Sequence, residues 1–434
     1  MLSITPPTTQ QIETKVIELI EEMTDEWDLD ETLDEISPAS HLIADLSFAS
    51  VDFVQLFVSI EEAFARKLGF HDLIMPNDKY VEDLSIAQIV AYIEAKLHPK
   101  AAPASLTASS ATVTAKPVQR LTATAVSQFR QLIPTPAAIA SSNPSKNPPA
   151  VFILSPPRSG STLLRVMLAG HPQLFAPPEL HLLTYETLQQ RQQALDNDLN
   201  RHLLIGAVRA LKQLNACSDE AAQEHMTAYA AQNLTVQEFY LKLQEALCDR
   251  ILVDKTPSYT YHVNILKRIE SLFDNARYIH LVRHPYGMIR SFEDAKLDQL
   301  VPFMRDSSFS SRERAELIWL TSHQNILSFL QQIEPERHLK VCYEDLVKAA
   351  EPTMQQICGF LQIPFVSSML NPYQDKDQRM TDGVQAVLQT SGDLKFHLHS
   401  GIEANMADRW KQFHTEDFLG DVSLEVARSF GYEV

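Results

Sequence analysis

The stretch VFILSPPRSGSTLLRVMLAGHP, from Val151 to Pro172, decides the fold of the larger part of this chain. An apolar run of strand type leads into small and polar residues, and an apolar helical pattern follows them. That order predicts a loop that brings a helix N-terminus to an anion, because close approach needs small residues and hydroxyl groups can donate to the anion. Nucleotide-binding loops of this kind normally end in Gly-Lys-Ser/Thr. Here Gly160, Ser161 and Thr162 stand at that place, and the cation, Arg158, lies upstream.

Further apolar runs follow the loop along the chain. RILVD, RYIHLVR and LKVCY, which begin at Arg250, Arg277 and Leu339, have the pattern of buried strands, and helix-compatible sequence follows each of them. Alternating strands and helices favour a parallel sheet covered by helices. We therefore predict an α/β domain with a central parallel sheet over residues 150–434.

The N-terminal part has a different pattern. Residues 1–98 are acidic, and apolar residues recur at helical spacing in three stretches, 12–23, 53–64 and 86–97, which predicts a small helical bundle. Residues 99–149 are rich in Ala, Pro, Ser and Thr. We expect a flexible linker there, because such a segment buries too little apolar surface to offset its ordering entropy. A short apolar patch around Phe129 to Ile133 is expected to dock transiently.

Composition excludes several classes of function. The 434 residues carry a formal net charge of -18, so the chain has no basic excess for general nucleic-acid binding. The four cysteines form no CxxC pair, which favours reduced thiols. No secretory pattern or apolar run of membrane-spanning length is present. We expect a cytoplasmic protein with neither nucleic-acid nor membrane partners.

The segment ADLSFASVDFVQLFVSIEEAF, from Ala44 to Phe64, resembles the signature of acyl carrier proteins. The resemblance implies a small all-α four-helix carrier domain over residues 1–98, with a 4′-phosphopantetheine arm on Ser50. Ser50 would begin a helix, and a helix N-terminus suits a phosphodiester. Ala49 departs from the usual aspartate at that position. The alternative is that Ser50 is only a helix N-cap.

PPRSGSTLL resembles the 5′-phosphosulfate loop of sulfotransferases, which use 3′-phosphoadenosine 5′-phosphosulfate (PAPS). The resemblance extends to YIHLVRHPYGMIRSF, where Arg283 and Ser291 stand eight positions apart and are implied to bind the 3′-phosphate. A third signature, YEDL, begins at Tyr343. The resemblance implies a P-loop-like sulfotransferase domain over residues 150–434, with a PAPS loop formed by Arg158, Ser159, Gly160, Ser161 and Thr162.

Sulfuryl transfer needs a base for the acceptor hydroxyl and cations for the leaving phosphate, but no metal where Arg, Lys and N–H donors suffice. Glu179, in HPQLFAPPELHLL, matches the catalytic glutamate of the tyrosylprotein branch, and desolvation is expected to raise its pKa. Lys255 resembles the family lysine at the bridging oxygen, and Arg158 adds a second cation. His181 and His262 are the alternative bases.

A carrier domain followed by a sulfotransferase resembles the terminal modules of cyanobacterial polyketide and olefin synthases. The resemblance implies sulfation of the β-hydroxyl of a carrier-bound acyl chain. The implied partners are upstream polyketide synthase enzymes, a phosphopantetheinyl transferase and a separate thioesterase. Two other functions stay open, a metal-dependent kinase on the same loop and a non-catalytic carrier scaffold. The stretch SGDLKFHLHSGIEANMADRWKQF resembles the late loop that closes over the nucleotide.

Overall fold

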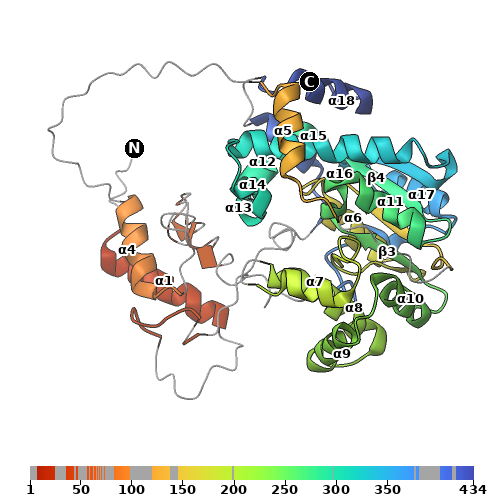
Figure 1. Ribbon diagram of the computed structural model, residues 1–434. Coiled ribbons are helices and arrows are strands. Elements are labelled where there is room, and N and C mark those ends of the chain that lie inside the picture. Colours follow the sequence, from red (N-terminus) through yellow and green to blue (C-terminus); the bar gives the residue numbers. More distant parts are fainter. Residues whose placement is uncertain are drawn as a thin grey trace. The chain divides into compact units, whose positions relative to one another are not determined.

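A computed structural model gives the fold of this chain (Figure 1). It describes residues 7–24, 36–43, 45–46, isolated positions between 56 and 73, 83–97, 120–136, 145–197, 200–295, 297–375, 378–380, 401–412 and 417–434. These residues divide into two compact units, the first within residues 7–97 and the second from residue 120 onward. None of the described helices is both long and apolar enough to cross a membrane.

In the N-terminal unit two helices are described, α1 (Thr9–Thr24) and α4 (Ile86–Leu97). Each buries one apolar face, as the helical spacing predicts. The two faces share a core with residues of the middle stretch, namely Leu42, Leu46, Leu56, Phe57, Ile60, Leu68 and Phe70. Ser50 and Ala49 lie outside the described residues, so the four-helix carrier domain and the attachment site stay predictions.

Part of the expected linker is ordered. Helix α5 (Ala123–Leu132) begins at the N-cap Thr122, whose side chain accepts from the Ala125 N–H at 3.2 Å. Phe129 is fully buried and contacts Phe303 edge to face, with ring centroids 5.9 Å apart. Arg130 donates to Asn325 at 3.0 Å. Residues 120–136 therefore belong to the C-terminal unit, because a short amphipathic helix buries enough apolar surface although its surroundings are rich in Ala, Pro and Ser.

The C-terminal unit is built on five parallel strands in the order β2-β3-β1-β4-β5. The strands are β1 (Val151–Leu154), β2 (Leu174–Phe175), β3 (Ile251–Lys255), β4 (Arg277–Val282) and β5 (His338–Cys342). Four of them lie where the apolar runs predict strands, so the parallel α/β sheet is confirmed. The fifth, β2, has only two residues and leaves no periodic signal in the sequence.

Helices pack against both faces of this sheet. Phe152 and Leu154 of β1 belong to one core and Val151 and Ile153 to another, since alternate side chains of a strand face opposite ways. The α-helices are α6 (Ser161–Ala169), α7 (Leu188–Leu195), α8 (Ile205–Asn215), α9 (Asp219–Ala231), α10 (Val236–Ala246), α11 (Val263–Leu272), α12 (Pro285–Asp294), α13 (Leu297–Leu300), α14 (Pro302–Arg305), α15 (Ser311–Leu330), α16 (Tyr343–Lys348), α17 (Ala350–Leu361) and α18 (Asp421–Phe430). Short 3-10 helices are η2 (Arg201–Leu204), η3 (Pro257–Tyr261), η4 (Pro335–Arg337), η5 (Ser367–Leu370), η8 (Ala404–Ala407) and η9 (Arg409–Gln412).

Candidate active site

The loop between β1 and α6 turns sharply at two left-handed residues. Arg158 has φ 61° and Gly160 has φ 84°. A Cβ atom on Gly160 would lie 2.2 Å from Cδ2 of Tyr343, so only glycine fits under that ring. The first signature and the YEDL signature are thus in direct contact, although 183 positions separate Gly160 from Tyr343.

This loop presents several donors in one place. Helix α6 begins at Ser161, and the first N–H groups of a helix have no acceptor within the helix. The hydroxyl groups of Ser155 and Ser159 are buried and have no hydrogen-bond partner among the described residues. Buried polar groups without a protein partner commonly point to a ligand or water. The loop therefore fits an anionic group such as phosphate or phosphosulfate.

The two predicted phosphate motifs meet side by side. Arg283 Nη1 donates to the carbonyl oxygen of Arg158 at 2.6 Å, and Arg158 Nε donates to Ser291 Oγ at 3.0 Å. Arg283 also lies over the Tyr343 ring, 4.4 Å from its centroid. Trp319 Nε1 fixes the Arg283 backbone by donating to its carbonyl oxygen at 3.1 Å. The structure thus brings Arg158, Arg283 and Ser291 together.

The YEDL signature connects the Arg283 region to the C-terminus through Glu344. One carboxylate oxygen of Glu344 accepts from the His284 N–H at 2.9 Å, and the other accepts from the Tyr432 hydroxyl at 2.8 Å. Trp410 stacks on His284 with centroids 4.0 Å apart. Neither Glu344 nor Trp410 was predicted as a site residue. Both side chains contact His284, the N-cap of α12, and α12 carries Ser291.

Glu179 and Lys255 form an ion pair beside the loop. Lys255 ends β3 with 1% of its side chain exposed, and 18% of the Glu179 side chain is exposed. The same Lys255 ammonium donates to the Thr162 hydroxyl at 3.4 Å. One cation therefore contacts both the predicted base and the predicted anion loop, and Lys255 is a buried lysine.

The ion pair reverses the expected effect on Glu179. Burial by itself raises the pKa of the Glu179 carboxyl, but the adjacent Lys255 ammonium outweighs burial and the pKa lies below the ordinary value. Burial lowers the pKa of the Lys255 ammonium, and the Glu179 carboxylate opposes that shift. The expectation of a raised pKa at Glu179 was wrong, because sequence alone does not show which cation faces the carboxylate.

The two alternative bases differ in their surroundings. His262 is the N-cap of α11, and its Nδ1 accepts from the Asn264 N–H at 3.1 Å. Burial lowers the pKa of His262. His181 has φ 48°, and its Nδ1 lies 3.4 Å from the Ser258 hydroxyl. His262 therefore caps the N-terminus of α11. His181 lies two positions after Glu179 in the same segment.

The sequence pattern did not predict the contact that helix α8 makes with Glu179. A Cβ atom on Gly206 would lie 2.0 Å from the carbonyl oxygen of Glu179. Gly206 therefore permits a close approach between α8 and the Glu179 backbone. A glycine inside an amphipathic helix was the available signal, since glycine there is costly unless packing requires it.

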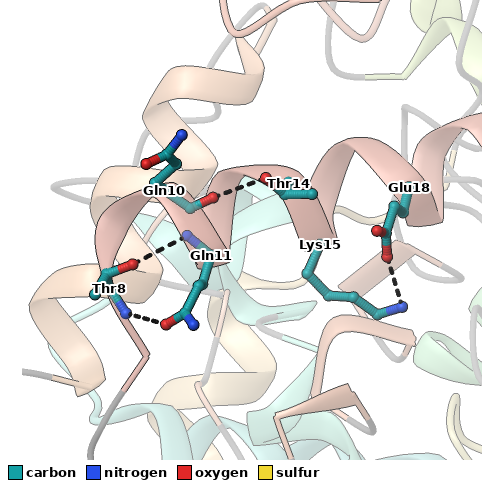
Figure 2. Close-up of a pocket in the computed structure, with 6 residues that line it drawn as sticks. All are labelled: Thr8, Gln10, Gln11, Thr14, Lys15 and Glu18. Atoms are coloured by element: carbon teal, nitrogen blue, oxygen red, sulfur yellow. Dashed lines mark hydrogen bonds and ion pairs between the residues drawn. The ribbon is translucent and has the colours of Figure 1, made fainter.

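A shallow depression also lies along α1 in the N-terminal unit (Figure 2). Its polar groups bond to one another: Gln11 accepts from the Thr8 N–H at 2.8 Å, and Lys15 pairs with Glu18 at 3.0 Å. All six lining residues, Thr8, Gln10, Gln11, Thr14, Lys15 and Glu18, belong to one helix and its N-terminal flank. None of the predicted site residues lines this depression.

Residues 149–367 match a protein family described as the sulfotransferase family. The sulfotransferase domain from the curacin biosynthetic pathway is 42% identical, with a TM-score of 0.62, and the match covers 67% of this chain and 100% of that one. The sulfotransferase domain from the Synechococcus PCC 7002 olefin synthase is 40% identical, with a TM-score of 0.61, and the match covers 69% of this chain and 100% of that one.

Two curated relatives are less similar in sequence. The nodulation protein NoeE of Sinorhizobium fredii is 32% identical over 228 residues, which are 48% of this chain and 49% of that protein. The protein-tyrosine sulfotransferase A of Caenorhabditis elegans is 23% identical over 296 residues, which are 67% of this chain and 68% of that protein. This chain thus spans about half the length of NoeE.

Proposed function

This chain belongs to the sulfotransferase family, and from that premise we propose that it transfers a sulfuryl group from PAPS to a hydroxyl group of an acyl chain carried on phosphopantetheine. The observation that carries the proposal is the position of Lys255. Its ammonium contacts the carboxylate of Glu179 and the hydroxyl of Thr162 in the loop. A base and an anion site that share one buried cation suit the transfer of a charged group to a hydroxyl.

The residues around the loop fit PAPS. The Ser159 hydroxyl, which has no partner within the described part of the chain, and the start of α6 would hold the 5′-phosphosulfate. Arg283 with Ser291 would hold the 3′-phosphate. PAPS, when bound, supplies the sulfuryl group and a phosphate leaving group. Because 3′-phosphate recognition needs a second cation, Arg283 distinguishes PAPS from a nucleotide that lacks this group.

The chain's own groups have distinct tasks. Glu179, ionised because Lys255 lowers its pKa, accepts the proton of the acceptor hydroxyl at a carboxylate oxygen. Lys255 and Arg158 supply positive charge that stabilises the leaving phosphate. Lys255 also keeps Glu179 ionised, so the same cation prepares the base and the leaving-group side. Burial of Lys255 strengthens both interactions because little solvent screens them.

We propose as acceptor the β-hydroxyl of an acyl chain held by a 4′-phosphopantetheine arm on Ser50. Two observations support this proposal. Two similar structures are sulfotransferase domains from the curacin biosynthetic pathway and from an olefin synthase. The N-terminal stretch around Ser50 has the carrier spacing. Partners would be upstream polyketide synthase enzymes, a phosphopantetheinyl transferase and a separate thioesterase.

The kinase alternative is weakened by the surroundings of Asp254. A kinase on this loop needs a carboxylate at the end of a neighbouring strand to hold Mg²⁺. Asp254 precedes Lys255, the last residue of β3, but its carboxylate accepts from the hydroxyl groups of Tyr240, Thr256 and Tyr259. It is also 1% exposed. Those hydroxyl donors already occupy both of its oxygens.

Intact-mass measurement tests the whole proposal. The chain is incubated with a phosphopantetheinyl transferase, a 3-hydroxyacyl-CoA and PAPS, and the mass should rise by the acylated arm and then by one sulfuryl group. Ser50→Ala should gain neither. A wild-type chain that gains the acyl arm but no sulfuryl group would overturn the transfer reaction, and a chain that gains no arm with several transferases would favour the scaffold alternative.

A further inference from the structure

Asp254 is a buried carboxylate for which the proposed transfer has no direct use. It accepts from the Tyr240 hydroxyl at 2.5 Å, from Thr256 Oγ1 at 2.9 Å and from the Tyr259 hydroxyl at 3.2 Å. Burial raises the pKa of Asp254 to about 6, so the carboxylate is ionised at neutral pH. A buried charge is costly unless several donors satisfy it, and three hydroxyl groups do so here.

Two of these hydroxyl groups also hold backbone amides. Thr256 Oγ1 accepts from the Leu180 N–H at 3.2 Å, and the Tyr259 hydroxyl accepts from the N–H groups of Leu182 at 2.9 Å and Leu183 at 3.3 Å. A hydroxyl has one proton, and each of the two donates it to Asp254. The lone pairs of the Thr256 and Tyr259 hydroxyl oxygens therefore face the backbone N–H groups. The charge of Asp254 thus fixes the direction of the network.

The same segment is held from its carbonyl side by Arg191 of α7. The Arg191 guanidinium donates to the carbonyl oxygens of Leu180 at 3.0 Å, His181 at 3.1 Å and Leu203 at 3.0 Å. Arg191 is 2% exposed. Residues 180–183 are therefore fixed through both their N–H and their C=O groups, as a packed polar network can do when its groups are satisfied.

We propose that Asp254, acting through Thr256 and Tyr259, is a positioning residue that holds Glu179 against Lys255. Asp254 precedes Lys255 on β3, and Thr256 bonds to the residue that follows Glu179. One network thus sets the relative position of both members of the ion pair. The inference rests on the proposed role of Glu179 as the base. Misplacement of a reacting group by about 1 Å costs up to about a hundredfold in rate.

Rates and affinities of four variants test this inference. Thr256→Val and Tyr259→Phe each remove one hydroxyl at nearly constant shape, and each should lower kcat about tenfold or more, with the KM for PAPS and for the acceptor within about twofold. The matched controls Thr321→Val and Tyr278→Phe remove equally buried hydroxyl groups that bond to Leu317 and Glu270 elsewhere in the C-terminal unit. They should leave kcat within about twofold.

The conservative variant separates positioning from packing. Thr256→Ser keeps the hydroxyl but loses a methyl group, so it should restore kcat to near the wild-type value. Wild-type kcat in folded Thr256→Val and Tyr259→Phe would overturn the inference. A loss of kcat in Thr256→Ser as large as in Thr256→Val would also overturn the inference, because the loss would then come from the missing methyl group and not from the missing hydrogen bond.

A second measurement does not depend on activity. Amide hydrogen exchange should show loss of protection at Leu180 in Thr256→Val, and at Leu182 and Leu183 in Tyr259→Phe, because each amide loses its acceptor. Unchanged protection of these amides would overturn the inference that the network holds residues 180–183. Failure of the proposed function looks different: the wild type would then transfer no sulfuryl group, while the exchange pattern still decides whether the network holds this segment.

Discussion

Gly206 of α8 lies against the carbonyl oxygen of Glu179 and leaves no room for a side chain, since a Cβ atom on Gly206 would lie 2.0 Å from that oxygen. The next obstacle is also backbone, the Glu179 carbonyl carbon at 2.8 Å. A flexible side chain could move aside, whereas this backbone is held by the Arg191 and Thr256 bonds to the residues that follow it. The position of the proposed base is therefore fixed from three directions.

Gly206→Ala should lower kcat by about tenfold or more, because the new methyl group displaces Glu179 from Lys255. Affinity for adenosine 3′,5′-bisphosphate should stay within about twofold, since a Cβ atom on Gly206 meets the backbone of Pro178 and Glu179 and not the nucleotide motifs. Gly359→Ala is the matched control: Gly359 also lies in a helix, α17, but a Cβ atom there meets nothing within 4 Å. That control should gain about 0.5–1 kcal/mol in unfolding free energy. Steady-state kinetics, calorimetry and thermal melts measure the three quantities.

Glu179→Gln should reduce turnover by about 10²–10⁴, the usual contribution of a general base. Bisphosphate affinity should change little. The unfolding free energy should fall by about 3 kcal/mol, because Lys255 keeps its burial and loses its counter-charge. Rates are therefore compared below the melting temperature of the variant, with Glu351→Gln, an exposed glutamate of α17, as the control. Full activity in Glu179→Gln together with loss in His181→Ala or His262→Ala would assign the base to a histidine.

Arg283→Ala should weaken binding of adenosine 3′,5′-bisphosphate by about 1.5–3 kcal/mol, the scale of a hydrogen bond to a charged group. Ser291→Ala should cost less, about 0.5–1.5 kcal/mol. Calorimetry with AMP supplies the internal comparison, because AMP lacks the 3′-phosphate and should bind both variants and the wild type alike. Arg428→Ala, an exposed arginine of α18, is the charge-matched control. Equal loss of AMP and bisphosphate affinity in Arg283→Ala would contradict a specific 3′-phosphate site.

The buried Glu316 of α15 should make the unfolding free energy depend on pH in an unusual direction. It is 2% exposed, accepts from the Gly420 N–H at 2.8 Å, and burial raises its pKa to about 7. Between about pH 4.5 and 7 the folded chain keeps a proton that the unfolded chain has lost, so the contribution of Glu316 to the unfolding free energy falls as pH rises.

Glu316→Gln removes this titration and keeps an amide oxygen for Gly420. The variant should therefore gain on the order of 3 kcal/mol over the wild type at pH 8, and little at pH 4. Denaturant titrations at both values measure the difference. Glu425→Gln, an exposed glutamate of α18, should show no such divergence with pH. An equal difference between Glu316→Gln and wild type at both pH values would contradict the raised pKa.

Much of the C-terminal fold follows from local pattern. Four strands are short apolar runs, and the loop that begins α6 has small residues where the backbone turns. β2 was missed because two residues carry no periodicity, and α5 because the Ala, Pro and Ser content of the surrounding segment outweighed one apolar face. Local composition does not show whether a partner surface exists, and the surface that covers Phe129 comes from residues more than 150 positions away.

The site residues also divide into those that sequence patterns predicted and those whose contacts come from distant parts of the chain. The loop pattern predicted Arg158, and likeness to the family predicted Arg283, Ser291, Glu179 and Lys255. The structure brings Arg158, Arg283 and Ser291 together and pairs Glu179 with Lys255. The lowered pKa of Glu179 was not predicted, nor were the tasks of Gly206, Glu344 and Asp254. Each of these depends on a neighbour distant in sequence, and sequence patterns specify residues along an element better than contacts between elements.

An acyl chain tethered to Ser50 should be a better substrate than the same acyl group free in solution. If an arm on Ser50 delivers the acyl chain, sulfation of the carrier-bound chain should be faster than sulfation of the same acyl group on CoA, because the tether raises the local concentration to roughly millimolar without a tight interface. At micromolar substrate we expect a difference of about 10²-fold or more. The control is a chain that begins at residue 120 and retains α5, which packs on the C-terminal unit. When acylated residues 1–98 are supplied as a separate protein, sulfation by this shorter chain should lose the rate advantage of the tether. Its rate should then depend on the concentration of the separate carrier. Acyl-CoA that reacts as fast as the tethered chain would make the N-terminal unit a passenger, while Glu179 and Lys255 would keep their proposed roles.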